Sequence, residues 1–318
     1  MSEVSDWAAA FTASVRSVFR GSDEPVRKII VALLCRGHVL IEDVPGVGKT
    51  MLARAVAASI GGKYSQIQCT PDLLPADVLG VSIYNQARGE FEFREGPVMT
   101  NVLLVDEISR ATPRTQSALL EAMAEGQVSV EGRSLPLPDP FLLIATESPV
   151  ESEGTFPLPE VQKDRFFLSL RLGYPDRDAE RAIMLQQRQA SSPLSLVRPV
   201  VETARLVEMQ RQVLTVHVSP LLRKYILRLV SATRTDPRLV LGVSPRGSLA
   251  LYKGAQALAA VRGRTYAVPE DVRDIAVSVL RKRLILKEEG SAPGAAEEAV
   301  LAELLGSVPV PPLEEAAS

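Results

Sequence analysis

The 318-residue sequence predicts an α/β protein: a parallel five-stranded sheet with helices on both faces, followed by a smaller all-helical domain. Three observations support this class. Up to about residue 175, short apolar segments alternate with amphipathic helical patterns, as is typical of a parallel sheet. Two segments in this region alternate in polarity around short turns, which predicts inserted β-hairpins. Beyond Tyr174 and Pro175 the pattern is helical, with few β-branched runs.

Each element has a local signal in the sequence. The five strands are expected at 38–42, 64–68, 101–105, 141–146 and 166–172, and the hairpins at 81–94 and 128–137. Helices are expected at 4–20, 25–36, 51–60 and 113–125, and another begins at Pro269. Thr112 is the expected N-cap of the helix at 113–125, Pro113 occupies its first position, and Gly126 ends it.

These elements divide the chain into four parts. Residues 1–175 form the sheet domain, 176–199 a linker, and 200–290 the helical domain. Residues 291–318 are rich in Ala, Glu and Pro and are expected to be disordered.

A glycine-rich segment follows the first strand and precedes a helix, which is the context of a phosphate-binding loop. The two glycines let the backbone approach phosphate oxygens, and the N–H groups at the helix start point towards the anion. The predicted phosphate-binding residues are Val44, Pro45, Gly46, Val47, Gly48, Lys49, Thr50 and Met51. Lys49 would reach the β- and γ-phosphates, and the Thr50 hydroxyl would bind Mg²⁺. Asp43 stands where the common pattern has Gly, and a Gly-Lys-Thr turn alone also arises by chance.

Two carboxylates, Asp106 and Glu107, end the apolar strand at 101–105. Asp106 would hold Mg²⁺ through water, and Glu107 would orient and deprotonate the attacking water. An Asp-Glu pair after a strand can also cap the next helix. Because a phosphate loop precedes this pair by about one βαβ unit, the sequence favours a Mg-ATP hydrolysis site.

Composition limits the other possibilities. The two cysteines and two histidines lack the spacing of a metal site or a redox motif, so the cysteines are expected to be free thiols. They are Cys35, Cys69, His38 and His217. No apolar run reaches the ~18 residues of a membrane span, and the amino terminus lacks a signal-peptide pattern. These features predict a cytoplasmic protein without membrane insertion.

Charge is unevenly distributed along the chain. Residues 201–290 hold 16 basic and 8 acidic residues, whereas 291–318 hold five Glu and no basic residue. A basic second domain is compatible with nucleic-acid binding. The sequence favours a face that meets nucleotide and a neighbouring subunit, because no interleaved aromatics or helix-turn-helix pattern accompany the charge.

Four longer segments resemble the MoxR family of AAA+ ATPases. They are 40–50, 68–77, 115–123 and 154–166, and the resemblance extends over about residues 15–290. It implies an AAA+ P-loop NTPase core with a helical lid, and ATP bound with Mg²⁺ between them. It also accounts for the aspartate that opens the loop.

The resemblance implies further site residues. Arg165 stands where such proteins have an arginine finger that reaches the neighbouring subunit's γ-phosphate, and Arg246 stands at the second sensor of the lid. Ser148 and Ser109 replace the usual Asn in the first sensor and in the carboxylate motif, so slow turnover is one expectation. Without the resemblance, the sequence favours simpler roles: Arg165 as an ion-pair partner of a nearby acidic residue, Asp164 or Glu160, and Arg246 as part of a solvated helix start.

The function implied is a chaperone-like ATPase that remodels or matures partner proteins. A finger supplied by a neighbour implies a homo-oligomeric ring, expected to be a hexamer. The resemblance also implies a protein partner with a von Willebrand factor A domain. Two alternatives stay open: a nucleic-acid-associated AAA+ ATPase, which the sequence disfavours, and a regulatory switch that holds ATP with slow turnover.

Overall fold

The computed structural model describes residues 1–130, 132–148, 154–186, 193–287 and 294–312. Its main sheet has five parallel strands in the order β2-β5-β8-β1-β9, which confirms the predicted sheet. The strands are β1 (Val39–Glu42), β2 (Tyr64–Gln68), β5 (Val102–Asp106), β8 (Leu142–Glu147) and β9 (Leu168–Leu170). Only β8 lies between β5 and β1, and the three strands are parallel. The carboxyl-terminal ends of β5 and β1 therefore lie near each other, at the edge of the sheet where its strands end.

Helices cover both faces of the sheet, so alternate residues of a strand feed different cores. On one face Leu104 and Ile41 pack with helices α1, α2, α3 and α8, whereas on the other Leu103 and Leu40 pack with α5. These helices are α1 (Ser2–Arg16), α2 (Asp23–Leu34), α3 (Lys49–Ser59), α5 (Pro113–Glu125) and α8 (Thr203–Val213). The Thr112 side chain caps α5, and Gly126 ends it in the left-handed conformation, as predicted.

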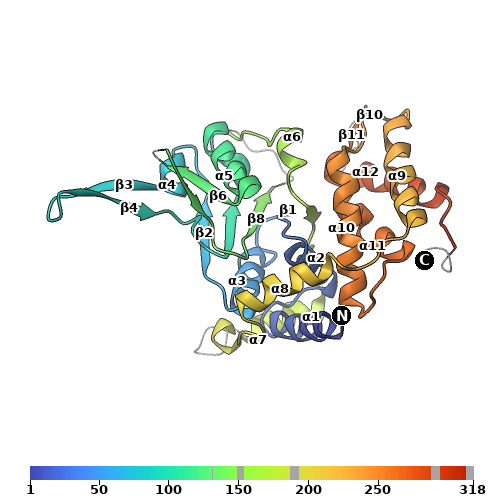
Figure 1. Ribbon diagram of the computed structural model, residues 1–318, viewed down its shortest axis with the longest axis horizontal. Coiled ribbons are helices and arrows are strands. Elements are labelled where there is room, and N and C mark those ends of the chain that lie inside the picture. The colour runs from blue at the N-terminus through green and yellow to red at the C-terminus, as the bar shows by residue number, and fades with distance from the viewer. Residues whose placement is uncertain (131, 149–153, 187–192, 288–293, 313–318) are drawn as a thin grey trace.

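Both predicted hairpins are present as antiparallel pairs outside the main sheet. They consist of β3 (Gly80–Asn85) with β4 (Glu90–Glu95), and β6 (Gln127–Val130) with β7 (Arg133–Pro136). Helix α4 (Pro75–Leu79) leads into β3. Figure 1 shows the β3–β4 hairpin extending far from the sheet, and the exposed rings of Tyr84 and Phe91 pack on each other 5.2 Å apart between centroids.

The lid lies at the opposite end of the molecule from this hairpin (Figure 1). Its elements are α9 (Pro220–Thr235), β10 (Leu239–Leu241), α10 (Pro245–Val261), α11 (Pro269–Leu280), β11 (Ile285–Leu286) and α12 (Ala295–Ser307). Helix α10 packs on α1 and α2, and α11 packs on β9. Buried residues of the lid and of one sheet face therefore form a single hydrophobic core.

One prediction about an irregular segment was wrong. The linker expected at 176–199 contains α7 (Arg177–Gln186), in keeping with the helical pattern of this region, and Asp176 caps its start, since its Oδ1 accepts a hydrogen bond from Ala179 N at 2.8 Å. Residues 187–192 of this linker lie outside the described part. The expected disordered tail contains α12, because Leu301 and Leu304 are buried in the core shared with the lid. Residues 313–318 lie outside the described part.

The remaining helical elements are short: α6 (Glu160–Lys163), η1 (Ile108–Arg110), η2 (Pro193–Leu196) and η3 (Arg281–Arg283). Among the described residues, no helix combines the length and the apolarity that crossing a bilayer requires.

Candidate active site

The glycine-rich segment forms a loop between β1 and α3, as predicted. Gly46 and Gly48 have φ angles of 87° and 94°, in the left-handed region that disfavours residues with a Cβ. Helix α3 begins at Lys49, directly after Gly48. The first N–H groups of this helix have no partner within the helix, so the segment Val44–Met51 is suited to bind an anion.

Asp43, where the common pattern has Gly, fastens this loop to the chain beyond β9. Asp43 is 7% exposed, and its Oδ2 accepts hydrogen bonds from Leu172 N at 2.6 Å and Gly173 N at 2.8 Å. Oδ1 accepts from Val44 N at 2.8 Å. Lys49 Nζ donates to the Asp43 carbonyl oxygen at 3.0 Å. The aspartate therefore has a structural role that a glycine could not fill.

The two carboxylates lie at the same sheet edge, where β5 ends. Thr146 of β8, which is fully buried, connects them: its Oγ1 donates to Asp106 Oδ1 at 2.5 Å and accepts from Glu107 N at 2.9 Å. Sequence analysis missed Thr146. The alternation of side chains along a strand could have indicated its position: Thr146 lies on the same face of β8 as Ile144, and this face packs against α3.

Glu107 has an uncommon backbone and an engaged side chain. Its φ and ψ are both 54°, a left-handed conformation at the point where β5 turns into η1. Its Oε2 accepts from Arg110 Nη1 at 3.0 Å and from Gln68 Nε2 at 3.3 Å. Gln68 ends β2, the neighbour of β5, so its position follows from the strand order. Neither contact was predicted from the sequence.

Arg165 and Arg246 both lie close to Asp164, Arg165 as its neighbour in the chain and Arg246 through an ion pair. Arg165 is exposed and donates to the Leu120 carbonyl oxygen of α5 at 3.1 Å. Arg246, at the start of α10, is more than half exposed, with Nη1 3.7 Å from Asp164 Oδ2. Asp164 also accepts from Ser244 Oγ at 2.9 Å and Arg283 Nε at 2.7 Å. Asp164, one of the two carboxylates expected to pair with Arg165, is thus bound by residues of the lid.

The serines at the usual Asn positions have different surroundings. Ser109 is part of η1, and its carbonyl oxygen accepts from Phe156 N at 2.5 Å. Ser148 follows β8 and is partly buried. Between it and Thr146 stands Glu147, whose carboxylate lies 3.5 Å from Lys163 Nζ. Burial raises the pKa of Glu147 even though Lys163 opposes that rise.

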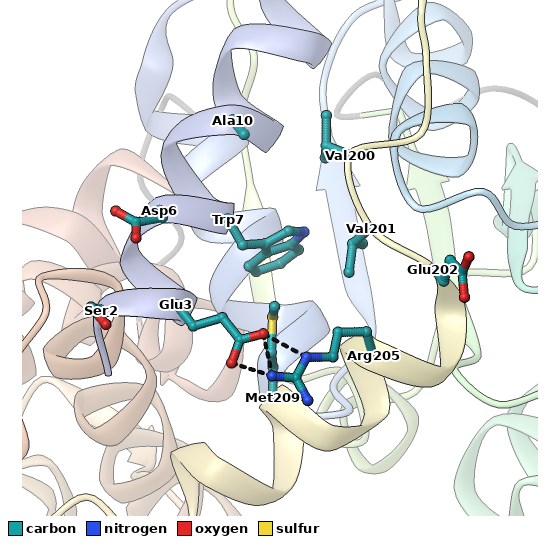
Figure 2. A pocket seen from close by; sticks show the side chains of 10 residues that line it. All are labelled: Ser2, Glu3, Asp6, Trp7, Ala10, Val200, Val201, Glu202, Arg205 and Met209. Carbon is teal, nitrogen blue, oxygen red and sulfur yellow. Dashed lines mark hydrogen bonds and ion pairs between the residues drawn. The ribbon is translucent and has the colours of Figure 1, made fainter.

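A surface hollow of about 720 Å³ lies elsewhere, between α1, the segment 200–202 and α8. Figure 2 shows the Trp7 indole against it and the ion pair of Glu3 with Arg205 at its edge. Its lining contains no residue of the phosphate loop and neither Asp106 nor Glu107. We therefore place the candidate active site at the sheet edge and not in this hollow.

Comparison with known proteins agrees with this geometry. Residues 38–168 match the family described as "ATPase family associated with various cellular activities (AAA)", and residues 231–304 match the "AAA lid domain". The chain is 49% identical to "Uncharacterized protein YeaC" of Bacillus subtilis, covering 89% of this chain and 88% of that one.

Two further matches cover almost the whole chain. It is 42% identical to "Chaperone MoxR1" of Mycobacterium tuberculosis, covering 93% of this chain and 80% of that one. A crystal structure of a Cytophaga hutchinsonii protein superposes with a TM-score of 0.90 at 34% identity, covering 98% of this chain and 96% of the other. Identity of this extent, together with the loop, the carboxylates and the lid, shows that the chain belongs to the MoxR family of chaperone-like AAA+ ATPases.

Proposed function

We propose that the protein binds Mg-ATP at this edge and hydrolyses it to ADP and phosphate. The observation that carries the proposal is the strand order, which brings the phosphate loop after β1 and the carboxylates after β5 together across a single strand. Lys49 and the loop N–H groups hold the phosphates, and Mg²⁺ is held by Thr50 and, through water, by Asp106. Glu107 accepts the proton of the attacking water.

The active form that we propose is a ring, with six subunits expected, in which Arg165 and Arg246 act on a neighbour's nucleotide. Arg283, which binds Asp164, also donates to the Phe166 and Phe167 carbonyl oxygens at the amino-terminal end of β9. The phosphate loop follows the carboxyl-terminal end of β1, which runs parallel to β9. The placement of both arginines near Asp164 therefore favours action in trans.

Mixing two inactive variants tests this arrangement. Lys49→Ala removes phosphate binding in its own subunit, and Arg165→Ala removes only the finger that it supplies to the next one. Each variant alone should hydrolyse little ATP, whereas mixed rings should regain part of the activity, because an intact loop can meet an intact finger. A mixture as inactive as its components, with ring formation verified by light scattering, would contradict action in trans.

We propose that ATP hydrolysis drives the remodelling or maturation of a partner protein that carries a von Willebrand factor A domain. The relative named "Chaperone MoxR1" and the exposed apolar hairpin β3–β4 support a protein partner. A Glu107→Gln variant with Mg-ATP should retain this partner from cell extract, and Lys49→Ala should not. Recovery of nuclease-sensitive material instead would favour the nucleic-acid alternative.

A second candidate is a slow regulatory switch in the cytoplasm. It is favoured by one observation: Arg110 and Gln68 both engage the carboxylate oxygen of Glu107. In a slow switch Glu107→Gln changes turnover little, whereas in a remodelling ATPase it abolishes hydrolysis while ATP binding persists. Single-turnover hydrolysis by wild type and by Glu107→Gln therefore distinguishes the slow switch from the remodelling ATPase.

A further inference from the structure

The hydroxyl of Thr146 bonds to both carboxylate residues of the site, to Asp106 through a side-chain oxygen and to Glu107 through the backbone N–H. We propose that Thr146 is a positioning residue for Mg-ATP hydrolysis, which fixes Asp106 and Glu107 through this one hydroxyl. The inference rests on the proposed function and deepens it.

The bond to Asp106 determines which carboxylate oxygen faces the metal. At 2.5 Å, the contact between Thr146 Oγ1 and Asp106 Oδ1 has the length of a charge-assisted O–H···O⁻ hydrogen bond. With Oδ1 engaged, rotation of the carboxylate is restricted and Oδ2 remains for a metal-bound water. Mg²⁺ demands near-ideal octahedral geometry, so a fixed carboxylate favours its binding.

The bond to Glu107 supports an unfavourable backbone. Left-handed φ and ψ angles of 54° are uncommon for a residue with a long side chain, and they persist where the surroundings hold them. The N–H of Glu107 donates to Thr146 Oγ1 at the position where β5 ends. Without this acceptor a partly buried N–H would lose its partner and Glu107 could relax away from its present direction.

Packing alone gives no reason for a hydroxyl at this position. The preceding β8 residues Leu142–Ala145 are apolar and buried, and Val would match Thr146 in shape and in strand preference. The resemblance to MoxR proteins implies a site role for Ser148, yet the β8 side chain that contacts both carboxylate residues is that of Thr146.

The test compares Thr146→Val with Thr146→Ser, since only the serine keeps the hydroxyl. The readouts are kcat, the Mg²⁺ concentration giving half-maximal rate, and ATP binding with and without Mg²⁺. Loss of hydrogen bonds to a charged group predicts that Thr146→Val lowers kcat by about tenfold to a hundredfold. Its half-maximal Mg²⁺ concentration should rise, its Mg-free ATP affinity should match wild type, and Thr146→Ser should stay close to wild type in all three.

Two controls separate positioning from folding. Thr146→Ala and Thr146→Ser both lack the methyl group and differ only in the hydroxyl, so this pair keeps the test valid if the valine protein does not fold. Thr100→Val makes the same exchange at a buried threonine whose Oγ1 has no hydrogen-bond partner among the described residues, and it should keep wild-type kcat and Mg²⁺ dependence.

The proposal is overturned if Thr146→Val keeps both kcat and the Mg²⁺ dependence, or if Thr146→Ser is as impaired as Thr146→Ala. Wild-type protein that binds Mg-ATP without hydrolysing it would refute the proposed activity instead. In that case the gain in ATP affinity on adding Mg²⁺ still tests the inference: a gain equal in Thr146→Val and wild type overturns it, and a gain lost only in Thr146→Val supports it.

Discussion

Arg281 of the lid forms an ion pair with Glu42, the last residue of β1. The arginine is 7% exposed, and its guanidinium also donates to Glu298 of α12 at 2.6 Å and to Ser169 of β9 at 3.3 Å. The next residue, Asp43, binds the backbone that leaves β9. Glu42 and Asp43, which lead into the phosphate loop, thus bond to the lid and to the chain that runs from β9 towards the lid, respectively.

Removing one partner of this pair should destabilise the protein strongly. Arg281→Met leaves Glu42 without its cation in a largely buried position, and such losses amount to roughly 3–5 kcal/mol. The double variant Arg281→Met with Glu42→Gln should recover part of that free energy, because residue 42 then carries no charge, while Glu298 keeps its ion pair with Arg171. Urea unfolding of the single and the double variant measures both changes in the free energy of unfolding.

The exposed pair Arg16–Asp23 provides the matched control for this measurement. Arg16→Met should change the unfolding free energy by less than about 1 kcal/mol, since both side chains are solvated. An Arg281→Met protein no less stable than Arg16→Met would show that the buried pair contributes little.

Restoring the common loop pattern with Asp43→Gly should also destabilise the protein while leaving phosphate binding in place. The variant removes the acceptor of Leu172 N and Gly173 N. An unpaired N–H at the half-buried Leu172 costs about 1–3 kcal/mol, whereas Gly173 is exposed and its N–H can bond to water. Lys49 bonds to the backbone oxygen of residue 43, which glycine retains. For this variant, thermal unfolding should therefore show a lower melting temperature, whereas calorimetric titration should show an ATP affinity close to that of wild type.

Asp43→Asn is the control for this substitution, because its amide oxygen can still accept from the two N–H groups. It should lie between wild type and Asp43→Gly in stability. A glycine variant of unchanged stability but abolished ATP binding would reverse the roles assigned to side chain and backbone.

His38 should make the protein sensitive to acid. Its Nδ1 accepts from Leu143 N at 3.0 Å, so Nε2 carries the proton and donates to the Met123 carbonyl oxygen at 3.1 Å. Burial lowers the pKa of His38 to about 4 from an ordinary 6.5. Between these values the unfolded chain binds more protons than the folded one, so stability is complete above about pH 6.5 and falls as pH drops towards 4.

The loss attributable to His38 should be on the order of 3 kcal/mol across that window. Urea unfolding at pH 5 and pH 7.5 measures part of it. A His38→Leu variant should be less stable at neutral pH, because Leu143 N loses its acceptor, but its stability should depend less on pH in this range. An equally steep dependence in His38→Leu would assign the effect to other groups.

The elements that the sequence predicted are those encoded by neighbouring residues. Helix α5 could be placed because Thr112, Pro113 and Gly126 mark its ends locally, and the phosphate loop because its glycines and lysine are contiguous. Strand order alone then brings the loop to the carboxylates.

The contacts that the sequence could not predict join distant residues. Glu42 and Arg281 are 239 positions apart, and Asp43 and Leu172 are 129 apart. Thr146 was hidden for a different reason: a β-branched residue in a buried strand has an adequate explanation in strand preference, so its hydroxyl attracted no attention. Helix α12 was missed because an Ala- and Glu-rich composition resembles that of disordered segments, and its burial depends on the lid.

Arg110 should restrain turnover in the isolated protein. Its Nη1 lies 3.0 Å from Glu107 Oε2, so the guanidinium engages an oxygen that the proposed reaction needs for the attacking water. Both side chains are partly solvated, so the contact is modest and Arg110→Met should raise basal kcat by only a few fold. The rise should shrink at high salt, where screening already weakens the pair in wild type. Arg114→Met, an exposed arginine on the following helix, should leave kcat unchanged. A lower kcat in Arg110→Met, at unchanged ATP affinity, would instead make Arg110 a residue that holds Glu107 ready for catalysis.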